Sequence, residues 1–310
     1  MAAKKQFQSE KMNILQNAVL VGLHFKEPGN TGRIDSEKVT GTDAELRSVR
    51  VTKMLLDSWE FQAIKSHRAT WRNGYLRHVA LPVAFGAPGM FVLPLTLLGK
   101  VEAAMLKFQQ RDTELIERVC AAYEERKEEA KIRLKSEYDE SDYPSPETFR
   151  ASFRSWWWYA SMAPSESLKE FDAVLYQRER KKFYEELDET IEKMKVALYS
   201  NCADLVEWMV SKLSDTDDGK QKVFGKPFDA KLEKMKEFMD TFKDRGGLIG
   251  FTELAPLVDQ AKGLLTGISS ERVKNNESFR NEMKKKFETV KSKLHSMVEY
   301  KASRSIILDE

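Results

Sequence analysis

The longest helical pattern in the sequence lies in the second half of the chain. Residues 165–218 form a run of 54 residues with neither glycine nor proline. A continuous helix of that length would measure ~80 Å. Helical patterns much longer than 25 residues with charged flanks are typical of a coiled-coil arm. We therefore predict a long helical arm over 165–218, whose apolar seam needs a partner and consists of Leu168, Phe171, Leu175, Leu187, Ile191, Met194, Leu198, Cys202, Leu205, Met209 and Leu213.

The rest of the chain is also weighted toward helices. Its 310 residues include 15 glycines and 9 prolines against 32% charged residues, and 41% hydrophobic residues exclude wholesale disorder. Apolar residues recur at helical spacing in 101–138, 229–244, 252–266 and 269–303. We predict a mainly α fold in which long helices form a coiled-coil-like hairpin or bundle. No linker is evident, so we expect a single interlocked domain over 1–310.

Three segments have the pattern of strands. Residues 17–25 are rich in Val and Leu and precede a turn, and residues 76–95 place two apolar runs around a Gly-Ala-Pro-Gly turn. Residues 155–162 contain Trp156, Trp157 and Trp158, which cannot share one face of a helix because neighbours turn by about 100°. We expect these segments to form a small antiparallel element, with 155–162 beside 17–25.

A basic region overlaps a predicted helix that starts at Thr42 or Asp43 and ends near Gly74. Residues 47–78 hold seven Lys and Arg against two acidic residues, with tryptophan and tyrosine interleaved. Guanidinium groups pair with phosphates and aromatic rings stack on bases, so Arg68, Arg72 and Arg77 are candidate contacts to nucleic acid or to an acidic partner. The simpler interpretation is a core-packing aromatic stripe with a solvated basic face.

The predicted C-terminal helix over 269–303 is basic as well. Residues 272–304 hold ten Lys and Arg against four acidic residues, including Lys284, Lys285 and Lys286. These lysines would contact phosphate, or the acidic helix at 112–142 of this or a neighbouring chain. Complementary charge between helices is the simpler explanation.

The three consecutive tryptophans, Trp156, Trp157 and Trp158, have two interpretations. Tryptophan dominates the energetics of protein interfaces, so they are candidate interface anchors. Burial in the chain's own core explains them equally well.

The sequence shows no catalytic constellation, and we predict no enzyme, cofactor or metal. Neither glycine-rich phosphate loop occurs, and the four histidines and two cysteines lack the spacing of a zinc site. Cys120 and Cys202 suit a reducing cytosol. The net charge of +2 argues against coating nucleic acid by bulk charge. The most apolar stretch, 79–98, contains three prolines, so we expect no membrane span, no secretion signal and a cytoplasmic protein.

The order of these elements resembles a known family. It includes the strand pattern at 17–25 followed by Gly32-Arg33, the Gly/Pro-containing apolar segment at 74–95, the loop 224–227 and the Leu-Leu-x-Gly turn at 264–267. Over about residues 13–269 this pattern is similar to the bacterial, phage and mobile-element family called domain of unknown function 3150. The last helix and the tryptophan run depart from it. The resemblance supplies no catalytic residues, but it implies a place near AAA+ ATPases of the MoxR type and von Willebrand A-type proteins.

Taken together, these features predict a non-enzymatic helical scaffold or adaptor of a phage or mobile element in a bacterial cell. It would act through self-association as a homo-oligomer, or by docking to a partner such as an AAA+ ATPase or a von Willebrand A-type protein. The alternative is a DNA- or RNA-binding accessory protein that uses its basic helices. An enzyme whose site the sequence does not reveal is the third hypothesis.

Overall fold

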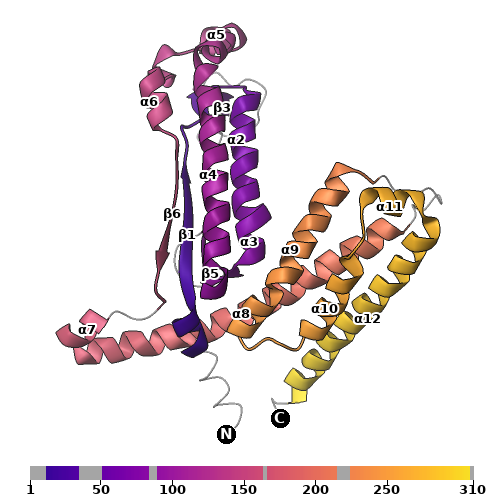
Figure 1. The fold of residues 1–310 in the computed structure, drawn as a ribbon. Coiled ribbons are helices and arrows are strands. Elements are labelled where there is room, and N and C mark those ends of the chain that lie inside the picture. Colours follow the sequence, from indigo (N-terminus) through magenta and orange to yellow (C-terminus); the bar gives the residue numbers. More distant parts are fainter. Residues whose placement is uncertain (1–11, 35–50, 84–88, 163–165, 215–223, 308–310) are drawn as a thin grey trace, which may run out of the picture. The chain divides into compact units, whose positions relative to one another are not determined.

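The structure, a computed structural model, describes residues 12–34, 51–83, 89–162, 166–214 and 224–307. These residues form a mainly α-helical fold with a minor antiparallel β component (Figure 1), which confirms the predicted fold class. The expected helix start at Thr42 or Asp43 lies outside the described residues.

The chain divides into two compact units, each assembled from distant parts of the sequence. The first unit comprises Met1–Val21, Tyr75–Gly99 and Tyr159–Glu310, and the second comprises Gly22–Gly74 and Lys100–Trp158. Because the chain leaves and re-enters each unit, neither is one continuous segment. The single interlocked domain over 1–310 stays a prediction.

Four helices build most of the first unit: α8 (Ala173–Leu213), α9 (Lys226–Leu248), α10 (Ala255–Leu265) and α12 (Glu277–Ile307). Helix α8 packs on α9 and α12, and α10 packs on the same two neighbours (Figure 1). Their apolar stripes meet in one core. The short helices α3 (Arg77–Val79), α7 (Glu166–Phe171) and α11 (Ser270–Asn275) complete the unit.

Helix α8 accounts for most of the predicted arm, but the helical segment is divided. The Asp172 carboxylate caps the start of α8 by accepting hydrogen bonds from Val174 N (2.9 Å) and Leu175 N (3.0 Å), which separates α7 from the 41-residue α8. The seam of α8 from Leu187 onward is buried in the core of the same unit. The partner that we expected for this part of the seam is therefore supplied by the chain itself.

The C-terminal helix is also divided. Ser269 caps α11, and Asn276 Oδ1 accepts a hydrogen bond from Phe279 N (2.9 Å) at the start of α12. Each cap satisfies a backbone N–H group at a helix start. The single helix predicted over 269–303 is therefore a short helix followed by a long one.

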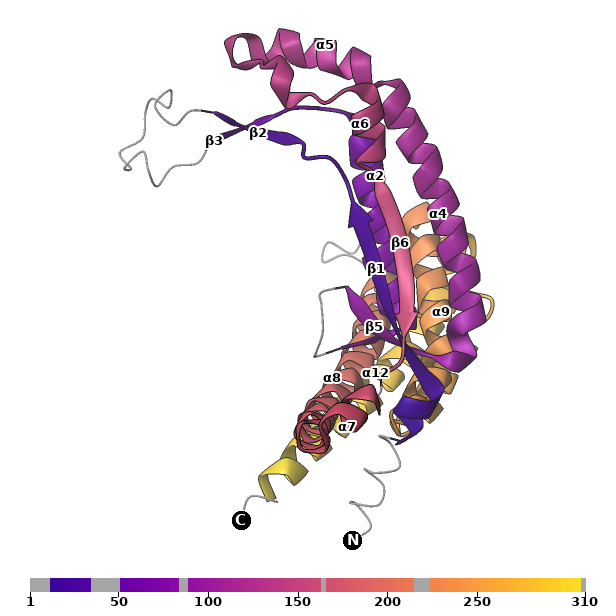
Figure 2. The same cartoon turned by 90° about the vertical axis from the view of Figure 1, so that its left-hand side faces the viewer.

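The second unit is built around α2 (Trp59–Ala69) and α4 (Leu98–Ala121), which run side by side (Figure 2). Ser58 caps α2 by accepting a hydrogen bond from Phe61 N (3.2 Å). Helical structure continues past Gly74, as a π-helix over Thr70–Leu76 and then as α3. The remaining helices of the unit are α5 (Tyr123–Leu134) and α6 (Pro146–Ala151).

Residues just before α2 form a strand where we predicted helix. Strand β3 (Val51–Met54) pairs antiparallel with β2 (Thr31–Ile34). Lys53, which falls inside the helix predicted from Thr42 or Asp43 to Gly74, instead pairs with Asp142 at 2.7 Å. The helix prediction was wrong here because it merged strand β3 with the helix that follows Ser58.

The larger sheet has the strand order β4-β5-β1-β6. Its strands are β1 (Ala18–Lys26), β4 (Leu81–Pro82), β5 (Met90–Pro94) and β6 (Arg154–Ala160). They match the three predicted segments, except that β1 extends one residue past 25 and β6 starts one residue before 155, and β6 lies beside β1 as expected. A Cβ atom at Gly22 would come within 2.5 Å of the Trp158 ring, so glycine allows this indole to lie close against β1.

Candidate functional site

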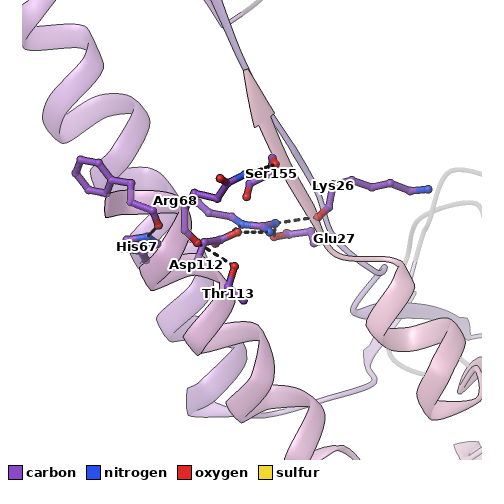
Figure 3. A network of polar contacts seen from close by, with 9 residues as sticks. Lys26, Glu27, His67, Arg68, Asp112, Thr113 and Ser155 are labelled. Carbon is purple, nitrogen blue, oxygen red and sulfur yellow. Dashed lines mark hydrogen bonds and ion pairs between the residues drawn. The ribbon is translucent and has the colours of Figure 1, made fainter. Parts of the chain in front are cut away.

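An ion pair between Arg68 and Asp112 lies at the centre of the second unit (Figure 3). Arg68 Nε donates to Asp112 Oδ1 at 2.9 Å, and Nη2 donates to Oδ2 at 3.0 Å. Arg68 Nη1 donates to the carbonyl of Lys26 at 2.9 Å. The side chains of Arg68 and Asp112 are 4% and 1% exposed. This network joins α2, α4 and the end of β1.

This geometry gives Arg68 a structural role. A buried charge is tolerated when a bidentate partner and further hydrogen bonds offset its desolvation. All three guanidinium nitrogens of Arg68 donate to groups within the unit. Of the three arginines proposed as phosphate contacts, Arg68 already has its guanidinium bound by groups of the protein itself.

Arg72 and Arg77 are placed differently from each other. Arg72 Nη2 donates to the carbonyl of Leu23 at 2.9 Å, and its guanidinium carbon lies 5.0 Å from the centre of the Phe25 ring. Burial lowers the pKa of Arg72. Arg77 is exposed in the first unit. The structure therefore does not gather the three arginines into one free basic surface.

A shallow cleft borders the Arg68 network. It encloses about 360 Å³ and is lined by Phe25, Glu27, Lys65, Arg68 and Arg72, among others. Glu27 Oε2 lies 3.4 Å from Arg68 Nη1, so a carboxylate already faces part of the positive charge. The cleft lies beside the π-helical turn Thr70–Leu76, a distortion that is frequent at functional sites.

The three tryptophans of β6 alternate between two environments. Trp157 Nε1 donates to Glu102 Oε2 at 2.9 Å, and its ring packs edge-on against Trp71, with 6.0 Å between centroids. Trp156 and Trp158 instead meet His24 of β1. Alternation along a strand produces this division, as the strand interpretation of the run implies.

His24 connects the other two indoles into a cluster. The Trp156 ring stacks on His24 at 5.3 Å, and Trp158 Nε1 donates to His24 Nε2 at 3.0 Å. The Arg154 guanidinium lies 4.9 Å from the centre of the Trp156 ring. Both indoles are half-buried, so each retains accessible ring surface. Their role as interface anchors stays a prediction.

The three consecutive lysines of α12 lie mainly on its solvated side. Lys285 and Lys286 are exposed, and Lys284 is half-buried. Lys286 pairs with Glu282 and Lys284 with Glu288 on the same helix. Lys291 of α12 reaches across to Glu207 of α8 at 2.6 Å. Lys291, which we did not single out in the sequence, thus links α12 to α8 by complementary charge within the first unit.

The junction of α7 and α8 exposes apolar side chains. Phe171 is 87% exposed and Val174 is 81% exposed. Within residues 171–182, all of which are described, Tyr176 alone is buried. We call this segment, 171–182, the α8 tip. It contrasts with the apolar seam from Leu187 to Leu213 on the same helix, which is buried and which we call the sealed seam.

The chemistry of the cysteines gives no sign of a reactive thiol. Burial raises the pKa of Cys202 to about 12 and raises that of Cys120 as well. A raised pKa keeps the thiol protonated and unreactive. Within the described ranges, no group of three or more His, Cys, Asp and Glu side chains is placed to hold a metal ion.

Sequence reasoning missed Asp112 and Glu60, two buried carboxylates that pair with arginines. Asp112 and Arg126 interrupt the apolar seam of the 101–138 pattern, and each pairs with a residue of α2: Asp112 with Arg68, and Arg126 with Glu60 at 3.0 Å. Burial acts to raise the pKa of Glu60, but hydrogen bonds from Arg126 and Ser58 outweigh it and lower the pKa. A charge on an apolar seam is the signal that would have located both pairs.

Comparisons with known proteins identify no relative. The chain matches no known protein family, no curated protein and no solved structure. The resemblance to domain of unknown function 3150 therefore stays a prediction. Among the helices that the structure describes, none has the length and hydrophobicity needed to cross a membrane.

Proposed function

We propose that the protein is a non-enzymatic helical scaffold or adaptor that acts through contact with a second protein or a second copy of itself. The observation that carries this proposal is the exposed apolar pair Phe171 and Val174 at the α8 tip. Apolar side chains that share one exposed site mark a protein interaction surface more often than scattered ones do. The Asp172 cap holds the backbone between them.

Ion pairs along the helix support the α8 tip. Lys182 donates a hydrogen bond to Glu179 at 3.1 Å, and Lys181 lies 3.8 Å from Glu185. Pairs three and four residues apart support a helix by about 0.2–0.5 kcal/mol each. The tip therefore presents Phe171 at the end of α7 and Val174 at the start of α8 on preformed helices, which reduces the entropy lost on binding.

The partner in this proposal is a second copy of the chain or an AAA+ ATPase system, as the family resemblance implies. A phage or mobile-element origin and the cytoplasm of a bacterial host are parts of the same proposal. The sealed seam from Leu187 to Leu213 gives no support to docking, because the chain's own helices cover it. Docking in this proposal rests on the tip.

The test is a double substitution at the tip, Phe171→Glu with Val174→Glu. In the wild type we expect light scattering to detect an oligomer, or a complex with an added AAA+ ATPase of the MoxR type. We expect the double variant to lose it, because two carboxylates would have to be desolvated in the interface. Val196→Glu is the matched control: Val196 lies on the same helix, outside the tip, and is 64% exposed. A wild-type protein that is monomeric and forms no such complex, or equal loss in both variants, would overturn the proposal.

A second function is favoured by the cluster of His24, Trp156, Trp158 and Arg154. Rings with accessible faces beside a guanidinium group form the kind of platform on which single-stranded nucleic acid stacks. Stacking contributes about 1–3 kcal/mol per base. The protein would then be a DNA- or RNA-binding accessory protein that reads bases on β6 rather than through Arg68.

This alternative predicts binding to single-stranded DNA that weakens steeply with salt and quenches tryptophan fluorescence. Trp156→Ala should weaken binding at least tenfold. Trp59→Ala should leave it unchanged, since Trp59 is 63% exposed on α2 and belongs to no such cluster. Absence of binding at low salt would eliminate the alternative and leave the docking proposal standing.

A further inference from the structure

A polar cleft in the first unit lies between α3, α8 and α9. It encloses about 440 Å³, and its polar lining consists of His78 from α3, Asn201 and Asp204 from α8, and Lys231 and Lys234 from α9. This volume falls in the range typical of sites for small molecules. Three separate stretches of the sequence converge here.

The imidazole of His78 is the unusual group in this cleft. His78 is half-buried, and its Nδ1 atom is buried without a hydrogen-bond partner among the residues that the structure describes. A buried polar nitrogen that lacks a partner is destabilising, and such groups in native proteins call for a specific explanation. Because this atom is closed off from solvent, a ligand in the cleft would meet the accessible part of the His78 ring and not Nδ1.

The charges that face His78 are predominantly positive. Burial lowers the pKa of His78, and Lys234, Arg245, Arg77 and Lys231 lower it further. These cations come from α3 and α9. The neutral imidazole is therefore favoured at physiological pH, and a neutral ring can donate or accept a hydrogen bond.

Two observations show that this positive charge is only partly offset. Asp204 is the acidic residue in the lining, against two lysines, and it acts to raise the pKa of Lys231. Burial nevertheless lowers the pKa of Lys231 overall. The ammonium of Lys231 lies 4.9 Å from the centre of the Trp208 ring, which holds it beside the cleft.

We propose that this cleft binds a small phosphate-bearing molecule. Lys231 and Lys234 contact the phosphate oxygens as point charges, and the accessible part of the His78 ring lies beside the same group. Asn201 and Asp204 lie on the α8 side, where they bind the hydroxyl or amino groups of the remainder of the ligand. The site is independent of the α8 tip and of β6.

The test follows the His78 ring signal by NMR in the full chain during titration with inorganic phosphate and with pyrophosphate. The signal is assigned with His78→Gln, and sodium chloride at matched ionic strength controls for screening. We expect a saturable shift with both anions and a weaker, non-saturable response to chloride. Bound phosphate should also raise the pKa of His78, since it offsets the surrounding cations.

Paired variants separate the cleft from general surface charge. Lys231→Gln with Lys234→Gln should weaken phosphate binding at least tenfold, and both side chains are exposed, so the fold should persist. Lys236→Gln is the control on the same helix: Lys236 pairs with Glu233 at 2.7 Å and does not line the cleft. The proposal is overturned if the signal responds equally to chloride, if neither anion shifts it, or if the double variant binds phosphate as the wild type does.

Discussion

Arg68 and Arg245 show two ways of placing a cation inside this protein. Arg68, in the second unit, makes two parallel hydrogen bonds to Asp112 at 2.9 and 3.0 Å. Arg245, on α9 in the first unit, is 0% exposed and donates to backbone carbonyls of its own helix, Phe238 O at 2.9 Å and Thr241 O at 3.3 Å. Within the described part of the chain, Arg245 Nη1 has no hydrogen-bond partner.

This difference determines what each charge contributes to stability. The Asp112 carboxylate offsets the desolvation of Arg68, so removal of one partner leaves the other charge buried and uncompensated. Arg245 has weaker compensation, since its guanidinium lies 4.5 Å from the centre of the Phe238 ring and burial lowers its pKa to about 9. We infer that the pair with Asp112 offsets the cost of burying Arg68, whereas the poorly compensated charge of Arg245 destabilises the native state.

The largest effect is expected at the paired arginine. Arg68→Met should lower the free energy of unfolding by about 3–5 kcal/mol, because Asp112 is left as a buried, unpaired carboxylate. Urea denaturation followed by circular dichroism measures this loss. A loss under about 1 kcal/mol would mean that Asp112 finds another partner, and would remove the contrast with Arg245.

The double variant Arg68→Met with Asp112→Leu is the control for this prediction. Replacement of a buried ion pair by apolar residues of similar volume is often close to neutral. We therefore expect the double variant to regain most of the stability that the single variant loses. If the double variant were as unstable as Arg68→Met alone, or less stable, loss of packing by the arginine stem rather than loss of charge pairing would explain the first result.

A smaller effect of opposite sign is expected at the other arginine. Arg245→Met should raise the free energy of unfolding by about 1 kcal/mol, because it removes a poorly compensated charge while the side chain still fills the core. Thermal and urea unfolding both report this change. Lys236→Met, on the accessible side of the same helix, should remain within about 0.5 kcal/mol of the wild type. Destabilisation by Arg245→Met would show that the first unit compensates this charge.

The sequence distinguishes these two arginines only in part. Asp112 interrupts an apolar seam, and a carboxylate in that position predicts a buried cation nearby. Arg245 follows Asp244 and precedes two glycines in a pattern that resembles an ordinary charged helix end. Arg245 is buried because of how α9 packs in the first unit. Charge counts and periodicity in the sequence do not predict that packing.

The long helices and the strand at β6 were predictable because each has its own periodicity. Three consecutive tryptophans cannot share one face of a helix, which favoured a strand, and β6 confirms the strand. The ribbon of β2 and β3 was missed because four-residue strands carry too little pattern, and Val51–Met54 could be read as an extension of the helix that Ser58 actually starts. The cap at Ser58 sets the boundary between β3 and α2.

The candidate sites were less predictable than the fold. Arg68 and Arg72 belonged to a basic stretch of sequence, yet burial removed Arg68 from the surface. The cleft around His78 combines residues from 78 to 234, and no local motif links them. The α8 tip could not be separated from the sealed seam, because both halves of the helix have similar apolar spacing. Tertiary packing alone distinguishes them.

The smallest expected effect is a pH dependence that Arg245 should impose. The unfolded chain keeps this guanidinium protonated at its ordinary pKa, whereas the folded pKa is about 9, so above pH 8 the unfolded state binds more protons. Stability should therefore rise with pH, by at most about 1 kcal/mol between pH 8 and pH 9.5 from this group. Lysines and tyrosines titrate in the same window, so the measured quantity is the difference between the wild type and Arg245→Met in urea unfolding. That difference should shrink toward pH 9.5, and a constant difference would show that Arg245 stays charged in the folded core.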